Sequence, residues 1–332
     1  MVLYYSICRL PTISSIQEKL KSNSFNGELF LPIESPFSSF RSGTFEEPIG
    51  KTKVMGEETK VMELNTTPSI FKAPSHMIKN LNKNKSLLKN LVSRDFKVNY
   101  HGHILGYFWS LLEPLALTGI FFLVFIILRG DSDTLLPLKI MIGILIFNSF
   151  SRTLSSCTAC LVSNAALIQQ VYFPREIFPT AIAGFRLLSL ILSMTVVIPY
   201  MILEKIAPTQ TILLLPLAMF SAILLAQGIG MMTASIQVRI RDTKQVVDLI
   251  LRAAFFLSGV FFGAEHIPPE YLDIFLMNPV AVYIEMARAA ILGDMTFLTT
   301  IQIIRALAVS VIMFLIGSII FVKSERKAVK FL

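Results

Sequence analysis

The sequence predicts an all-α membrane protein with six transmembrane helices, an N-terminal amphipathic interface helix and a re-entrant helix pair between helices five and six. Of its 332 residues, 54% are hydrophobic and only 16% are charged, whereas soluble domains carry about 25% charged residues. The first long apolar run, Tyr107–Leu128, would form a helix about 33 Å long, enough to cross a hydrocarbon core of about 30 Å. Lys and Arg stand in short segments beside such runs, as topology signals do.

Residues 1–75 are predicted to be a polar, mostly disordered cytoplasmic extension. They hold eight Lys or Arg and eight Glu, so the net charge of +8 arises entirely after Ser75. Six prolines interrupt the stretch, and no long periodic segment occurs in it. Met55 and Met62 are alternative start sites. N-terminal sequencing of the native protein tests this hypothesis, which fails if residues before Met55 are found.

Residues 76–100 are predicted to form an amphipathic helix that lies in the headgroup layer. Apolar residues recur at spacings of three and four along one face, while Lys and Arg supply the charge. The apolar face consists of Leu88, Leu91, Val92, Phe96 and Tyr100. The alternative is a solvated helix that packs on a partner protein.

Residues 101–326 are predicted to form the six-helix transmembrane domain, followed by a basic cytoplasmic tail at 327–332. The expected spans are Tyr107–Leu128, Leu135–Cys160, Ile177–Leu203, Thr211–Ile236, Val246–Phe262 and Ile301–Val322. Lys and Arg concentrate before the first span, between the fourth and fifth spans, and in the tail. With six spans these three regions share one side, so both termini are predicted to be cytoplasmic.

The connection between the fifth and sixth spans, Gly263–Thr300, is then outside. It is acidic, yet it contains two apolar stretches, Tyr271–Met277 and Val280–Leu292, each too short to span. Pro279 disfavours helix at Asn278 and favours the start of a new helix. A pair of short helices that dip back toward the bilayer is therefore expected.

Several functions are disfavoured by what the sequence lacks. No basic patch is interleaved with stacking aromatic residues in a polar context, so nucleic acid is not an expected partner. Cys157 and Cys160 fall in an apolar run without further metal ligands in sequence reach, and are expected to be small buried side chains rather than a metal site. No G-x-x-x-x-G-K-[ST] loop occurs, so this chain is not expected to bind ATP or to be an enzyme alone.

Four stretches resemble the permease subunit of type 2 ABC exporters, in the branch that exports polysaccharides such as capsule, O-antigen and teichoic acid. They are HGHILGYFWSLLEP (His101–Pro114), LIQQVYFPREIFP (Leu167–Pro179), RIRDTKQVVDLILRAAFFLSGVFF (Arg239–Phe262) and HIPPEYLDIFLMNPVAVYIEMARAAILGD (His266–Asp294). Their order and spacing agree over roughly 250 residues. Many relatives have Arg or Lys where His101 stands and Asn where Glu113 stands, and the N-terminal extension has no counterpart.

The resemblance implies that two copies of this permease work with two ATPase subunits, which bind the ATP and Mg, in the cytoplasmic (inner) membrane. The short piece before the third span is the candidate contact with the ATPase, because prolines bracket a turn that carries a charge pair. Its residues are Val171, Tyr172, Phe173, Pro174, Arg175 and Glu176. An ordinary helix connection is the alternative, and the basic helix before Tyr100 is a second candidate contact.

The first and fifth helices line the channel in the resembled family, and aromatic rings suit the C–H faces of sugars. The candidate lining residues are Tyr107, Phe108, Trp109, Phe121, Phe125, Phe255 and Phe256. Lipid-facing or interfacial positions are the alternative for each ring. The short helix pair is the candidate outer gate, with Asn278, Pro279, Glu285 and Arg288 as its key residues, although Glu285 and Arg288 could simply pair at a spacing of three.

Charges inside apolar runs are costly and mark functional candidates. Arg152 or Arg186 is the candidate partner of a phosphate or pyrophosphate on the substrate carrier, and the alternative is an inter-helix pair with Glu113. The predicted function is therefore export of lipid-linked polysaccharide, with membrane lipids, a second copy and an ATPase dimer as partners. Export of a lipid or drug on the same scaffold is the first alternative. A membrane-embedded prenyl-phosphate sugar transferase is the second, but Asp242 and Asp248 lie off a common helical face.

Overall fold

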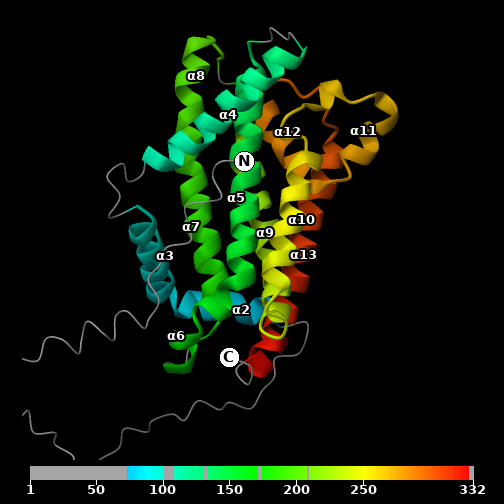
Figure 1. The fold of residues 1–332 in the computed structure, drawn as a ribbon. Helices are drawn as coiled ribbons and strands as arrows, with labels where there is room; N and C mark the ends of the chain where they lie inside the picture. The colour runs from blue at the N-terminus through cyan, green and yellow to red at the C-terminus, as the bar shows by residue number, and fades with distance from the viewer. Residues whose placement is uncertain (1–72, 101–107, 130–133, 171–173, 208, 329–332) are drawn as a thin grey trace, which may run out of the picture. The chain divides into compact units, whose positions relative to one another are not determined.

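The computed structural model describes residues 73–100, 108–129, 134–170, 174–207 and 209–328, and the regular structure in these ranges is entirely helical (Figure 1). Nearly all of the expected extension, four residues of the tail, and the candidate residues Tyr107, Val171, Tyr172 and Phe173 lie outside these ranges. Within them, the helices longer than 20 residues are α4 (Phe108–Arg129), α5 (Leu136–Ser163), α9 (Leu214–Gln237) and α13 (Thr300–Ala328).

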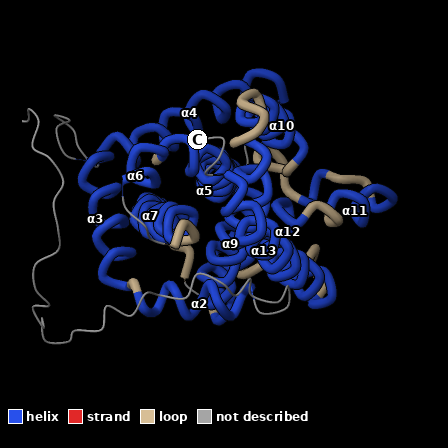
Figure 2. The backbone as a smooth tube through the Cα atoms, turned by 90° about the horizontal axis from the view of Figure 1, so that it is seen from below, coloured by secondary structure: helices blue, strands red, loops and turns tan. Residues whose placement is uncertain are grey.

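The packed centre is built by α5 and α9. Helix α9 contacts α5, α7 (Ile177–Ser193), α12 (Pro279–Leu292) and α13, and α5 contacts most of the same helices (Figure 2). In the most apolar 18-residue window of each helix, 67% of α5 is buried but only 11% of α4. Because α4 is the more apolar of the two, with a mean hydropathy of 2.2 against 1.3, it must face lipid or another chain over most of its surface.

Four of the expected spans are confirmed as helices long and apolar enough to cross a bilayer: Phe108–Ile127, Leu136–Ser163, Gln210–Gln237 and Thr300–Ser324. A fifth, Ile177–Leu203, consists of α7, a 3₁₀ turn at Met194–Val196 and α8 (Val197–Leu203). The turn has a local cause, because Pro199 has no N–H to donate to the carbonyl of Thr195 and its ring crowds that carbonyl.

The remaining expected span, Val246–Phe262, differs from the structure. Helix α10 (Thr243–Leu257) has 15 residues, about 22 Å, which is shorter than the hydrocarbon core. It ends because Gly259 adopts a left-handed backbone with φ of 69°, a conformation that residues other than glycine rarely adopt. By length and composition the described residues thus hold five spans, or six if the bent pair α11–α12 counts as one.

The expected break between two short helices is present at Asn278–Pro279. Helices α11 (Pro269–Phe275) and α12 meet at an angle of 107°. Asn278 caps α12 by accepting a hydrogen bond from the Val280 N–H at 3.0 Å, and Pro279 is its first residue. Every residue of α12 from Val280 to Ile291 is buried, so this helix is packed inside the protein rather than laid on its surface.

The expected amphipathic helix before the first span is two helices. Helix α2 (Ala73–Lys83) contacts α13 across the lower end of the bundle in Figure 1, and α3 (Lys85–Tyr100) runs alongside α7. The Tyr100 hydroxyl hydrogen-bonds the Ser189 hydroxyl at 2.7 Å. Ser189 lies twelve residues after Ile177, or about 18 Å along α7. Helix α3 therefore packs against α7, and its position relative to the headgroup layer stays a prediction.

Candidate functional site

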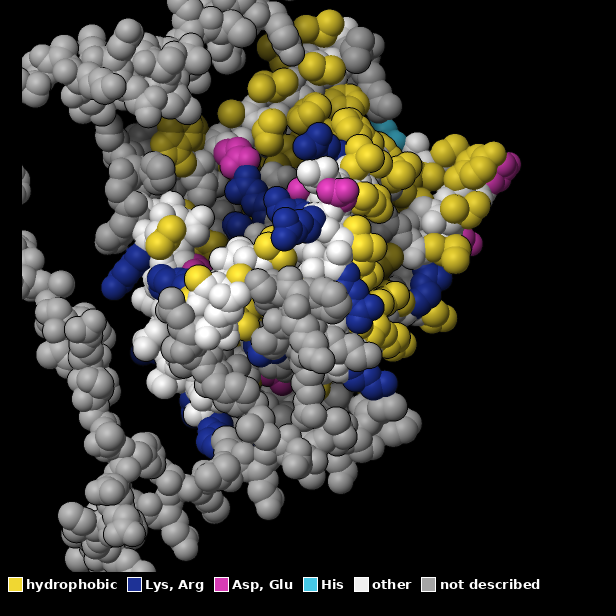
Figure 3. Space-filling model, turned by 60° about the horizontal axis from the view of Figure 1, so that its bottom comes forward, with side chains coloured by type: hydrophobic (Ala, Val, Ile, Leu, Met, Phe, Trp, Pro, Cys, Tyr) yellow, Lys and Arg dark blue, Asp and Glu magenta, His cyan; other side chains and the backbone are white. Residues whose placement is uncertain are grey.

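A cleft of about 860 Å³ with a mixed polar and apolar lining opens between α3, α4, α5 and α7. Its polar lining residues are Asn99, Tyr100, Ser110, Glu113, Asn148, Ser149, Arg152, Arg186, Ser189 and Ser193. Apolar residues of the same helices, among them Trp109 and Phe185, complete the lining. Figure 3 shows that basic side chains gather with a few acidic ones next to hydrophobic surface on the face it presents. Charged side chains in a cleft bordered by spanning helices are costly unless they are paired or hydrated, so this cleft is the candidate functional site.

The three intramembrane charges singled out in the sequence all line this cleft, each from a different helix. Glu113 comes from α4, Arg152 from the middle of α5, and Arg186 from nine residues into α7. The guanidinium of Arg152 forms an ion pair with the Glu113 carboxylate. The inter-helix pair that was the alternative expectation is therefore present, and it involves Arg152.

Arg186 has a different environment. One of its terminal nitrogens hydrogen-bonds the Ser156 hydroxyl at 3.3 Å, and its guanidinium lies 5.2 Å from the centre of the Phe185 ring. Its Nε is buried without a hydrogen-bond partner among the described residues. A buried guanidinium N–H that lacks an acceptor costs free energy. A ligand that supplied an acceptor to the Arg186 Nε would recover that cost.

The candidate channel aromatics divide into two groups. Trp109 lines the charged cleft, while Phe108 beside it is 53% exposed. Phe121, Phe255 and Phe256 instead surround Phe261, with ring centres 4.1, 5.0 and 5.7 Å from it, and Phe125 packs half-buried against the core. The contact between Phe121 and Phe261 joins α4 to the segment that follows α10.

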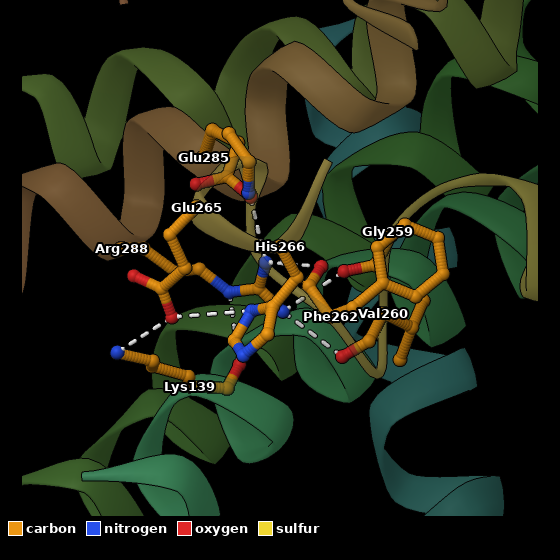
Figure 4. A network of polar contacts seen from close by, with 9 residues as sticks. Lys139, Gly259, Val260, Phe262, Glu265, His266, Glu285 and Arg288 are labelled. Atoms are coloured by element: carbon orange, nitrogen blue, oxygen red, sulfur yellow. Dashed lines mark hydrogen bonds and ion pairs between the residues drawn. The ribbon is translucent and has the colours of Figure 1, made fainter. Parts of the chain in front are cut away.

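Arg288, a residue of the predicted outer gate, is the centre of a buried hydrogen-bond network (Figure 4). Its Nε donates to the carbonyl of Lys139 at 3.1 Å. Its two terminal nitrogens donate to the carbonyls of Gly259, Val260 and Phe262 at 2.9, 2.9 and 3.1 Å, and to Glu285 at 2.7 Å. All five N–H donors of the guanidinium are used, and three of them bind carbonyls of the segment that follows α10.

The other residues of the expected gate belong to the same packed region. The Glu285 carboxylate also accepts the backbone N–H of Ala264 at 3.1 Å. The Asn278 side chain donates to the Ser258 hydroxyl at 3.2 Å. Nearer the surface, Lys139 pairs with Glu265 at 2.8 Å, and His266 lies 3.5 Å from the same carboxylate. These contacts connect α5, the end of α10 and α12. The pairing of Glu285 with Arg288, which was the expected alternative to a gating role, is present.

The expected coupling segment lies at the lower end of Figure 1, where α6 (Ala165–Gln170) follows α5. Pro174, Arg175 and Glu176 form the turn into α7, with the N–H of Ile177 and Phe178 bonded to the carbonyls of Pro174 and Arg175. Glu176 is only 2% exposed. Of the expected Arg175–Glu176 docking charge pair, the Glu176 carboxylate is thus turned into the protein, while Arg175 is partly accessible.

Several lining residues escaped sequence reasoning. Tyr100 and Ser189 meet only through the packing of α3 on α7, which no sequence pattern specifies. Asn148 and Ser149 did carry a signal, since they are adjacent polar residues within the apolar run of α5. Cys157 and Cys160 are buried side chains of the same helix, as expected.

Spanning helices around a charged cleft define a multi-pass membrane protein of the transport class. The chain belongs to the ABC-2 type transporter family, whose sequence match covers residues 86–292, from α3 to the end of α12. This range contains all three charges of the cleft. The family resemblance stated from the sequence motifs is thereby confirmed.

Named relatives come from polysaccharide export systems. The chain is 22% identical over 196 residues to the O-antigen export system permease protein RfbA of Klebsiella pneumoniae, covering 59% of this chain and 76% of that protein. It is 27% identical over 216 residues to the polysialic acid transport protein KpsM of Escherichia coli, covering 63% and 82%. It is 22% identical over 253 residues to the capsule polysaccharide export inner-membrane protein BexB of Haemophilus influenzae, covering 74% and 92%.

Proposed function

We propose that this chain is the transmembrane subunit of an ATP-driven exporter that moves lipid-linked polysaccharide, of the capsule or O-antigen type, from the cytoplasm to the outside. The observation that carries the proposal is the family match combined with relatives that are permeases for O-antigen, polysialic acid and capsule. The sequence has no phosphate-binding loop of its own. A separate ATPase dimer therefore binds ATP and Mg and drives transport by hydrolysis, and this chain performs no catalysis alone.

The same proposal includes a homodimer in the cytoplasmic (inner) membrane with both termini cytoplasmic. The sparse burial of α4 supports the dimer, because a second copy would cover a helix that this chain leaves open. The orientation is supported by the charge at one end of the bundle. Helix α6 and the turn between α9 and α10 both lie at this end, which is the lower end in Figure 1. That turn carries the basic residues Arg239, Arg241 and Lys244, which favour the cytoplasmic side.

The cleft is the proposed binding site for the phosphate group on the lipid that carries the substrate. Arg152 and Arg186 are two positive charges within one cleft, and guanidinium groups bind phosphate oxygens through paired N–H donors. Trp109 beside them offers a ring face for the first sugar. The aromatic cluster around Phe261 lies farther along α4.

Deleting the gene for this chain tests the proposed function. The expected result is loss of surface polysaccharide with accumulation of lipid-linked glycan inside the cell, both restored by a plasmid copy. Immunostaining intact cells and analysing extracted glycolipids by mass spectrometry measure the two quantities. Unchanged surface polysaccharide would refute the proposal, and accumulation of a different lipid or a drug would point to the other kind of exporter.

Replacing Arg175 by alanine is expected to leave the protein inserted but to abolish most export. Arg175 starts the turn into α7 on the proposed ATPase side, and a change there would remove a contact that transmits movement rather than one that binds substrate. Surface polysaccharide and ATPase stimulation by the purified complex are the measurements. Lys323→Ala, at an exposed position in α13, is the matched control, and equal export by both variants would contradict the coupling assignment.

A further inference from the structure

The cleft carries unbalanced charge and one buried hydrogen-bond donor that has no acceptor among the described residues. Its charged lining residues are Arg152, Arg186 and Glu113, two positive and one negative, which gives a charge of +1. Glu113 pairs with Arg152. Arg186 keeps a buried Nε without a partner among the described residues. An additional anion would complete the hydrogen bonding of this cleft, and the structure already shows where a carboxylate binds in it.

The Glu113–Arg152 pair is not a buried structural tie. The two side chains remain 46% and 47% exposed, in contrast to 11% and 4% for the side chains of Glu285 and Arg288. A ligand that enters the cleft can reach a pair whose side chains are accessible, whereas a buried pair is out of reach and costly to break. The pair at the cleft can therefore be opened by a competing anion, and the one beneath α10 cannot.

We propose that the Glu113 carboxylate is a built-in competitor, which occupies on Arg152 the position that a ligand's phosphate takes and is displaced when that ligand binds. A phosphate group offers more charge and more acceptor oxygens than a carboxylate, so it can bridge Arg152 and Arg186 together. Choosing a lipid-linked phosphate as the ligand rests on the proposed function. The competition itself rests on the ion pair and the unpartnered Nε.

Displacement of Glu113 has a mechanical consequence. Glu113 belongs to α4 and Arg152 to α5, and α4 packs mainly on α5. A phosphate on Arg152 thus removes an ionic contact that holds α4 in place. Occupation of the cleft is in this way coupled to the freedom of the helix that the chain leaves most exposed.

Binding of a polyprenyl phosphate to the purified chain in phosphatidylcholine nanodiscs tests the competition, with polyprenol as the uncharged probe and inorganic pyrophosphate as the lipid-free one. Glu113→Gln is expected to bind polyprenyl phosphate about fivefold to tenfold more tightly than the unmodified chain, because a competing ion pair is removed. Arg152→Gln should bind it at least about tenfold more weakly. The double variant should match Arg152→Gln, since Glu113 acts through Arg152.

Glu265→Gln is the matched control, because it opens the Lys139–Glu265 pair away from the cleft and should leave binding unchanged. Glu113→Asp keeps the charge on a shorter side chain, so its affinity for polyprenyl phosphate should lie between that of the unmodified chain and that of Glu113→Gln. Unchanged or weaker binding by Glu113→Gln, or a double variant that binds more tightly than Arg152→Gln, overturns the proposal. Tighter binding of pyrophosphate alone would support the competition with a free phosphate as the ligand. The binding assay contains no ATPase and does not measure export. If the expected binding differences are found but cells lacking this chain still export polysaccharide, the proposed function fails and the competition stands.

Discussion

Arg288→Met is expected to lower the free energy of unfolding by about 3–5 kcal/mol, the loss typical of a buried ion pair from which one partner is removed. The guanidinium is 4% exposed and donates to four backbone carbonyls as well as to Glu285. Methionine fills a similar volume but offers no donor, so the Glu285 carboxylate stays buried without its cation. Equilibrium unfolding in mixed SDS and detergent micelles measures the loss.

Two further variants separate charge from geometry in this network. Arg288→Lys keeps the positive charge but reduces five donors to three, so it should fall between the wild type and Arg288→Met. Arg305→Met removes an exposed arginine whose guanidinium donates to the Leu276 carbonyl at 2.7 Å, and should cost about 1 kcal/mol. If Arg288→Met lost no more stability than Arg305→Met, the buried network would not be what holds α10 and α12 together.

Gly317→Ala is expected to destabilise the protein by about 3 kcal/mol or more, the upper range for overpacked sites. A Cβ at this position would stand 2.2 Å from the carbonyl oxygen of Gly228 on α9. The obstacle is backbone rather than a movable side chain, so α9 and α13 would have to separate. Close approach at small residues is how spanning helices gain packing energy in a bilayer. The thermal unfolding midpoint of the detergent-solubilised protein should fall clearly.

Gly119→Ala supplies a control of opposite sign. Gly119 also lies inside a spanning helix, α4, but a Cβ there meets nothing within 4 Å. Alanine is the better helix former by about 1 kcal/mol, so this variant should unfold at the same temperature or slightly higher. Equal destabilisation by both substitutions would show that the contact between α9 and α13 is not the cause.

The sequence predicted most spans because long apolar runs reflect a local requirement, a helix long enough for the bilayer, that neighbouring helices do not alter. The break at Asn278–Pro279 was predictable for the same reason, since proline acts on its own backbone. The end of α10 was not predictable from hydrophobicity, because Val260, Phe261 and Phe262 continue the apolar run. There the chain turns at Gly259, and Arg288, 29 residues later, binds its free carbonyls.

The candidate site was predictable in part. Charges within apolar runs identified Glu113, Arg152 and Arg186 before their proximity was known, because their burial cost is visible in a single run. Which of them pair was not visible, and neither was the burial of Glu176 or the contact of Tyr100 with Ser189. These depend on which helix faces meet.

By itself, the sequence determined that this is a helical membrane protein without a phosphate-binding loop of its own, and it identified the family through four separated motifs. Only the tertiary structure decided that Arg152 is paired while Arg186 keeps an unsatisfied donor, and that the charges of α12 support the packing. The reason is physical. Hydrophobicity and proline act within one helix, whereas ion pairing and close helix contacts depend on the rotation of one helix against another.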